Sequence, residues 1–242
     1  MSKLQSLRSR LRIRQRFRSA ESLKHEEELA WWLNEWDPVI RAGGYNPGDA
    51  LELLGEDVVD DYQGRRWQQA RAEVVRILRE AEISDLGFFD GKVVLDIGSG
   101  PLGFPEACPA RVSIGVDPLA DAYRESGLLL KSNAIHLAIG AESIPLIAGS
   151  VDVVVARNSL DHVDNPRAVV GEAIRLLAPG GTLILTFDVG HTPTATEPHA
   201  LELETVLGWI ARLDVVSQRE YDYSMGHDGH AVTIVAAVPL VP

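Results

Sequence analysis

The chain contains little of several features that would place it in a particular class of protein. A single cysteine, Cys108, excludes an internal disulfide framework and any metal site built from cysteines. Apolar runs such as Val151–Ala156 have the length of a strand and are far too short to cross a membrane. No apolar secretory segment stands near the first residue, so a cytoplasmic protein is expected. The 45% of hydrophobic residues is enough for the core of a folded domain.

Basic residues are fewer than acidic ones and are unevenly placed. The net charge at pH 7 is −12, yet the first 20 residues contain Lys3, six arginines and no acid. The rest of the chain is therefore even more acidic and would repel a polyanion, which disfavours a nucleic-acid substrate. Residues 1–20 are interpreted as a basic arm, either a solvated tail or a contact for nucleic acid, anionic lipid or an acidic neighbour.

The segment 21–91 has the apolar spacing of helices. Apolar residues recur every three or four positions in Leu29–Trp36, and Pro38 is expected to interrupt this helix. The same spacing returns in Trp67–Ala81. We interpret 21–91 as a helical cap placed ahead of an α/β domain.

From residue 92 to 242 the pattern changes to strand, turn and helix. The first five predicted strands are short, apolar and β-branched with little alternation, as in a parallel sheet covered by helices on both faces. These features predict an α/β fold, a Rossmann-like doubly wound and mostly parallel seven-stranded sheet with an N-terminal helical cap. The predicted strands are Val93–Ile97, Val112–Val116, Ile135–Ile139, Val151–Ala156, Thr182–Phe187, Val215–Tyr221 and Ala231–Val238.

One predicted helix carries clear start and stop signals. Asn165 and Pro166 are typical of a cap and a first helical turn, and they begin a helix expected over Pro166–Leu177. The run Pro179-Gly180-Gly181 is expected to stop it. A second helix is expected over Leu201–Leu213.

A glycine-rich turn follows the first predicted strand. Within Val94–Gly103, Gly98 and Gly100 allow the backbone to turn tightly and to approach a ligand. With Gly103 they also match the dinucleotide fingerprint. Asp117, at the end of the next strand, can accept hydrogen bonds from a ribose, which suits NAD and S-adenosylmethionine equally.

Asp96 distinguishes between these two ligands. It stands two residues before Gly98, at the carboxyl end of the strand. A pyrophosphate there would face a negative charge, whereas the ammonium and sulfonium of S-adenosylmethionine would be attracted. Asp96 could instead only bond the backbone amides of the turn.

These residues and three later blocks resemble the class I S-adenosylmethionine-dependent methyltransferases, in the branch that methylates small molecules and sugars. The resemblance covers residues 92–187 and extends more loosely to the chain end. It implies S-adenosylmethionine as cofactor and methyl transfer to a small-molecule acceptor. The blocks that carry it are Val94–Gly103, Gly115–Leu119, Gly140–Val154 and Leu176–Leu183.

The resemblance implies a role for each matching residue. Asp96, Gly98, Ser99 and Gly100 would surround the methionine part of the cofactor, and Asp117 would hold the ribose.

The adenine would lie against Pro118 and Leu119, with the backbone amide of Ala141 at its edge. The family often has an acid just before this alanine, where this chain has Gly140. Glu142 is the expected substitute.

Arg157 and Asn158, after the fourth strand, would lie beneath the reacting sulfonium. His162 is the candidate general base for a hydroxyl acceptor, with Asp161 as its neighbour. A hydroxyl of a saccharide or secondary metabolite is the expected acceptor, on overall likeness alone.

Other histidines and carboxylates follow, but no recognised ligand spacing joins them, so no metal is expected. They are Asp188, His191, His199, His227, Asp228 and His230.

Two alternatives stay open at the level of sequence. The glycine spacing also suits an NAD-dependent oxidoreductase, although no Tyr-Lys or Ser-Tyr catalytic pair is visible. A non-catalytic, methyltransferase-like binding protein is the other. The oligomeric state is undetermined, and a homo-oligomer is compatible with the sequence.

Overall fold

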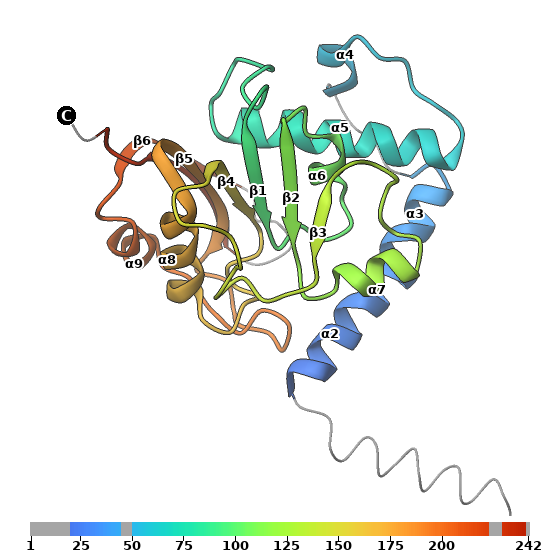
Figure 1. The fold of residues 1–242 in the computed structure, drawn as a ribbon. Helices are drawn as coiled ribbons and strands as arrows, with labels where there is room; N and C mark the ends of the chain where they lie inside the picture. The colour runs from blue at the N-terminus through green and yellow to red at the C-terminus, as the bar shows by residue number, and fades with distance from the viewer. Residues whose placement is uncertain (1–19, 45–49, 223–228, 241–242) are drawn as a thin grey trace, which may run out of the picture.

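The protein is built on one seven-stranded sheet (Figure 1). The computed structural model describes residues 20–44, 50–222 and 229–240; the predicted basic arm lies almost wholly outside them, as do His227 and Asp228. The strand order is β3-β2-β1-β4-β5-β7-β6, and only β7 runs antiparallel to its neighbours. The predicted fold class is thereby confirmed. The strands are β1 (Val93–Ile97), β2 (Val112–Val116), β3 (Ile135–Leu137), β4 (Val151–Arg157), β5 (Leu177–Val189), β6 (Asp214–Tyr221) and β7 (His230–Ala237).

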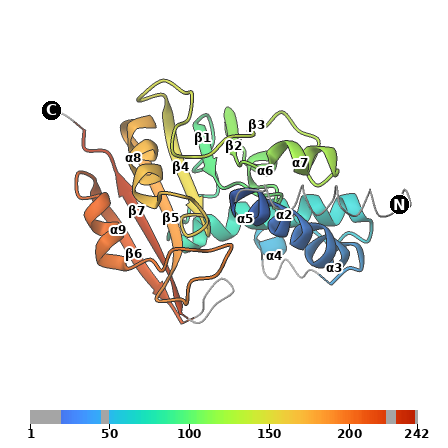
Figure 2. The same ribbon diagram turned by 90° about the horizontal axis from the view of Figure 1, so that it is seen from below.

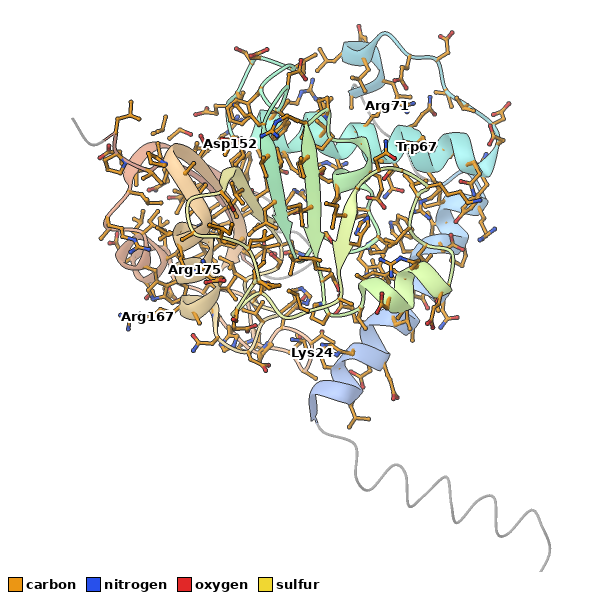
Figure 3. The ribbon with its side chains drawn as sticks, in the orientation of Figure 1. Lys24, Trp67, Arg71, Asp152, Arg167 and Arg175 are labelled. Carbon is orange, nitrogen blue, oxygen red and sulfur yellow. The ribbon has the colours of Figure 1, made fainter. Side chains whose placement is uncertain are left out.

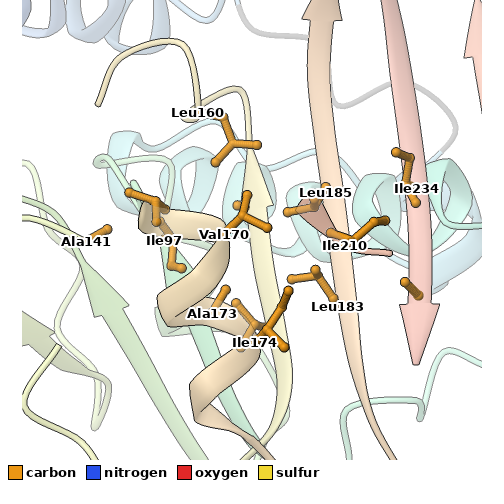
Figure 4. Close-up of a cluster of buried hydrophobic side chains, with 14 of the residues drawn as sticks. Ile97, Ala141, Leu160, Val170, Ala173, Ile174, Leu183, Leu185, Ile210 and Ile234 are labelled. Atoms are coloured by element: carbon orange, nitrogen blue, oxygen red, sulfur yellow. The ribbon is translucent and has the colours of Figure 1, made fainter. Parts of the chain in front are cut away.

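Helices cover both faces of the sheet, which explains why the central strands lack alternation. Helices α8 (Pro166–Leu176) and α9 (Leu203–Trp209) pack on one face, where Val170 of α8 lies with Leu183 and Leu185 of β5 (Figure 4). On the other face lie α5 (Tyr62–Glu80) and α6 (Phe104–Ala107).

Successive residues of β1 point to opposite faces, so that Val94 belongs to the cluster under α5 and Leu95 to the cluster under α8. Full burial of such a side chain stabilises the fold by roughly 1.5–3 kcal/mol.

The helix starts follow the local signals. The Asn165 side chain accepts from the Ala168 amide at 3.1 Å, and Pro166 occupies the first turn of α8, as predicted. Helix α8 ends at Leu176 and β5 begins at the next residue. Gly180, with φ of +73°, therefore lies within β5. Asp61 caps α5 by accepting from the Gly64 amide at 2.9 Å.

The prediction that Pro38 interrupts the first helix is wrong. Helix α2 (Ala20–Trp31), the π-helical turn η1 (Trp32–Trp36) and α3 (Asp37–Arg41) follow one another without a loop. In the wider π turn the Asp37 amide donates to the Trp32 carbonyl, and Pro38 stands in the first turn of α3, where no amide donor is needed. The short helix α4 (Ala50–Leu54) precedes α5.

The connections place an opening beside β1. This strand pairs with β2 on one side and with β4 on the other, so the chain builds the sheet outward from β1 in one direction through β3 and then in the other direction from β4. At such a point the loops at the carboxyl ends separate and form a ligand-binding crevice. Helix α7 (Ala120–Glu125) follows β2, and α2 passes this same edge, as Figure 2 shows from below. No described helix is both long and apolar enough to span a bilayer.

Candidate active site

A cavity of about 660 Å³ lies at the carboxyl ends of β1, β2 and β4. Helix α2 forms one wall, and Lys24 of that helix marks its position in Figure 3. Asp96, Leu119 and Asp161 are not part of its lining. Ten of the predicted site residues do line it: Gly98, Ser99, Gly100, Asp117, Pro118, Ala141, Glu142, Arg157, Asn158 and His162.

The glycine turn presents backbone to this cavity. Gly98 and Gly100 have φ of +66° and +49°, a conformation that side chains with a Cβ disfavour. A Cβ on Gly98 would lie 2.3 Å from the Cβ of Ser159, so the loop after β4 packs directly on the turn. The hydroxyl of Ser99 is buried and has no hydrogen-bond partner among the described residues. The turn can therefore offer close backbone approach to a ligand.

Two buried carboxyl groups flank the turn. Burial and the nearby charges of Glu106, Asp117 and Glu73 raise the pKa of Asp96 well above its ordinary value. A cation brought close to Asp96 would therefore restore its charged form.

Asp117 accepts from the amides of Gly100 at 3.0 Å and Leu119 at 2.8 Å, one on each oxygen. Burial, with the charge of Glu28, raises its pKa to about 6, against these two hydrogen bonds. Asp117 thus ties the glycine turn to the end of β2 and keeps lone pairs for a further donor.

Arg157, the last residue of β4, is held by an acid from α5. Its guanidinium donates to both carboxylate oxygens of Glu80, at 2.8 and 2.9 Å. Tyr221 of β6 donates its hydroxyl to the Glu80 carbonyl at 2.8 Å. The next residue, Asn158, adopts φ of +49° and donates its amide to Thr186 at 2.8 Å. The positive charge at this wall is therefore paired and fixed in place.

His162 lies in the cavity wall among acids. Its Nε2 atom is 3.4 Å from Glu197 and 3.9 Å from Asp161. Burial lowers the pKa of His162, but Glu197, Asp161 and Glu28 together outweigh it, so that the pKa is raised. Asp161 is completely buried, and its other oxygen lies 3.5 Å from Nε2 of His191.

Comparisons with known proteins agree on one family. Residues 95–185 match the model of a methyltransferase domain. A ubiquinone biosynthesis O-methyltransferase of Pseudomonas paraeruginosa (strain DSM 24068 / PA7) is 32% identical over 161 residues, which cover 61% of this chain and 68% of the relative. The chain belongs to the class I S-adenosylmethionine-dependent methyltransferases. S-adenosylmethionine is accordingly its cofactor.

One further relative is similar in sequence, and two solved structures share the fold. An uncharacterized methyltransferase of Mycobacterium sp. (strain JLS) is 29% identical over 150 residues, 61% of this chain, and the chain spans only 58% of that relative's length. The cyclase SpnF shares the fold with a TM-score of 0.58 at 15% identity, over 92% of this chain and 97% of that one. The N-methyltransferase NodS from Bradyrhizobium japonicum WM9 has a TM-score of 0.52 at 18% identity, over 70% and 96% of the two chains.

The cavity has atoms that suit the methyltransferase cofactor. Ser99 and Asn158 both line it, and a buried side-chain oxygen of each has no hydrogen-bond partner among the described residues. A cofactor rich in amino and hydroxyl groups can satisfy such atoms, which would otherwise be costly to bury. The lining therefore fits a ligand of this kind.

Two residues expected at the adenine have other contacts in the structure. Glu142 accepts from the amides of Asp164 and Asn165, at 3.2 and 3.3 Å, and so ties down the loop ahead of α8. The Leu119 side chain packs with Tyr123 in a separate apolar cluster. Glu142 still lines the cavity, and Leu119 borders it through its neighbour Pro118.

Sequence reasoning missed the contribution of α2 and of the loop after β5. Glu28 and Trp31 of α2 and Trp32 of η1 line the cavity, as does Glu197. The periodic tryptophans predicted a helix, but no local signal showed that it would lie against the glycine turn. Glu197 lies far along the chain from His162, with no motif between them.

Proposed function

We propose that the protein transfers the methyl group of S-adenosylmethionine to a hydroxyl of a small molecule, a saccharide or a secondary metabolite. One observation carries the proposal: a single cavity joins the glycine turn to the imidazole of His162. Its volume of about 660 Å³ lies within the range of roughly 300–1,000 Å³ that is usual for small-molecule sites.

The residues of the cavity would align the acceptor and exclude water. The cofactor supplies a methyl group already activated on a sulfonium. Fixing the acceptor oxygen in line with that methyl group can contribute about 7–11 kcal/mol to lowering the barrier. Trp31 at the end of α2 and Trp32 at the start of η1 would cover the acceptor side; their rings meet edge to face with centroids 4.8 Å apart.

His162 would take the proton of the acceptor hydroxyl at Nε2 as the oxygen attacks the methyl carbon. Asp161 and Glu197 would stabilise the imidazolium that forms. Such general-base assistance typically contributes about 10²–10⁴-fold to the rate.

The cofactor would be held as the sequence predicts. We assign the methionine part to Asp96 and the glycine turn, the ribose to Asp117, and the sulfonium side to Arg157 and Asn158. Pro118, Leu119, Ala141 and Glu142 would border the adenine.

We also propose a division of the chain into three parts. Residues 1–20 would be a basic arm, 21–91 a cap that completes the cavity, and 92–242 the cofactor-binding domain. A cytoplasmic location and self-association are further proposals.

Calorimetric titration with S-adenosylhomocysteine, followed by methyl-transfer assays on a panel of hydroxylated metabolites, tests the function. We expect a single site per chain and transfer to at least one hydroxyl acceptor. The absence of any binding heat at high protein concentration would count against it. Binding without transfer in cell extract would favour the non-catalytic alternative, and a thermal shift with NAD rather than S-adenosylhomocysteine would favour the oxidoreductase.

A further inference from the structure

Two loops at the cavity bring together four side chains of metal-ligating types, three of them around the carboxylate of the fourth, Asp161. Asp161 and His162 stand after β4, whereas His191 and Glu197 stand after β5. Single ligand atoms of Asp161, His162 and Glu197 all lie within 4.8 Å of one another. His191 approaches the other oxygen of Asp161, with 3.5 Å between its Nε2 and Oδ2 of the carboxylate.

Among the described residues, the carboxylate of Asp161 has two imidazoles nearby but no hydrogen-bond donor. Its side chain is completely buried, and neither oxygen has a hydrogen-bond partner among the described residues. A buried carboxylate in this situation is costly unless a cation or a set of donors faces it. The burial of an Asp161 carboxylate without a donor is an observation separate from the clustering of acids. It points to a positively charged occupant at Oδ1.

We propose that Asp161, His162 and Glu197 bind a divalent metal ion at the wall of the cavity. Ligands about 2.1 Å from a tetrahedral ion lie about 3.4 Å apart. The observed separations from His162 Nε2, 3.4 Å to Glu197 and 3.9 Å to Asp161, need only a small closure. The two carboxylates balance the charge of the ion.

The types of ligand favour a first-row transition ion over magnesium. A nitrogen ligand with two carboxylates suits Zn²⁺, Mn²⁺ or Fe²⁺, whereas Mg²⁺ prefers oxygen alone. His191 would support the site through the second oxygen of Asp161, as the outer partners of metal ligands commonly do.

This inference rests on the proposed function and refines it. His162 and Glu197 both line the cavity, so the free coordination positions of the ion would face the acceptor. An acceptor with one or two neutral oxygens, such as a diol, would bind there. When the ion is bound, Nε2 of His162 is a metal ligand and cannot act as the general base. Activity measured after metal removal therefore distinguishes the metal-bound site from a metal-free site in which His162 is the base.

The experiment uses the full chain, treated with a chelator, dialysed and titrated with Mn²⁺ by calorimetry and electron paramagnetic resonance. We expect one Mn²⁺ per chain, and a Kd raised by about tenfold or more in Glu197→Gln. Glu27→Gln, which changes an exposed acid of α2 at the same cavity, is the matched control and should bind as the wild type does.

S-adenosylhomocysteine affinity, measured on the same samples, separates this inference from the function on which it rests. We expect it to be unchanged by Glu197→Gln, which also shows that the variant is folded. No Mn²⁺ binding, or equal binding by Glu197→Gln and the control, overturns the metal site. If the chelated protein then binds S-adenosylhomocysteine and methylates at full rate, the metal inference alone fails.

Discussion

The guanidinium of Arg66 donates to the carbonyl of Pro101, just after the glycine turn, over 2.9 Å. The same nitrogen donates to the carbonyl of Leu128 at 2.5 Å, and the guanidinium lies over the Trp36 ring at 4.8 Å. Arg66 is almost completely buried. One side chain of α5 therefore connects the glycine turn, the segment after α7 and the helical cap.

Replacing Arg66 should weaken both the fold and the site. In Arg66→Met two buried carbonyls lose a charged donor, and we expect the free energy of unfolding to fall by about 3 kcal/mol. Because the turn after Gly100 is no longer held, S-adenosylhomocysteine should also bind less tightly. Urea denaturation and calorimetry measure the two effects. Arg167→Met, which changes an exposed arginine of α8 labelled in Figure 3, should leave both values near the wild type.

Gly98→Ala tests the close approach of the glycine turn and the loop after β4. The new Cβ would lie 2.3 Å from Ser159 and would require a positive φ, so we expect a loss of about 1–3 kcal/mol in stability. Gly171→Ala, in α8 with open space around it, should instead gain up to about 1 kcal/mol. Thermal unfolding of both variants checks the contrast. Equal effects at the two sites would contradict the packing described here.

Asp117 should make cofactor binding depend on pH. Its pKa of about 6 means that the carboxylate becomes protonated as the pH falls through 6 and loses acceptor capacity for a ribose. We therefore expect S-adenosylhomocysteine to bind more weakly below pH 6. Calorimetry across pH 5–8 measures this, and Asp117→Asn should bind weakly without that step.

The raised pKa of Asp117 also makes the free energy of unfolding depend on pH. The folded pKa lies above the ordinary value of 3.8, so between 3.8 and about 6 the folded state binds more protons than the unfolded one. The free energy of unfolding therefore falls as the pH rises through this window. Asp117→Asn should remove this part of the decline in urea titrations, and an unchanged slope would contradict the assignment.

His162→Gln should reduce turnover and spare cofactor binding. The amide keeps a polar side chain but can neither accept the acceptor's proton nor bind an ion as imidazole does, so we expect kcat to fall about 10²–10⁴-fold. The affinity for S-adenosylhomocysteine should change by less than about threefold, because His162 is proposed to face the acceptor and not the cofactor. His199→Gln, at a loop histidine outside the cavity lining, is the control. Unaltered kcat in His162→Gln would exclude a chemical role for the imidazole.

Much of the fold could be predicted because its signals are local. The bounds of Val93–Ile97 and Val112–Val116 match the observed strands, and Asn165 caps its helix as expected. Local rules were insufficient at Pro38. The π turn η1 ends just before α3, so Pro38 falls in the first turn of a helix, where its missing amide is not needed.

The sequence by itself determined the sheet, the glycine turn and the acids Asp96 and Asp117, because strand periodicity and glycine spacing depend on neighbouring residues. Only the tertiary structure decided that α2 closes the cavity, that Glu197 meets His162 and that His191 meets Asp161. These contacts join segments far apart in the chain, and they form because packing of the sheet and its helices, rather than any local preference, brings their loops to one edge.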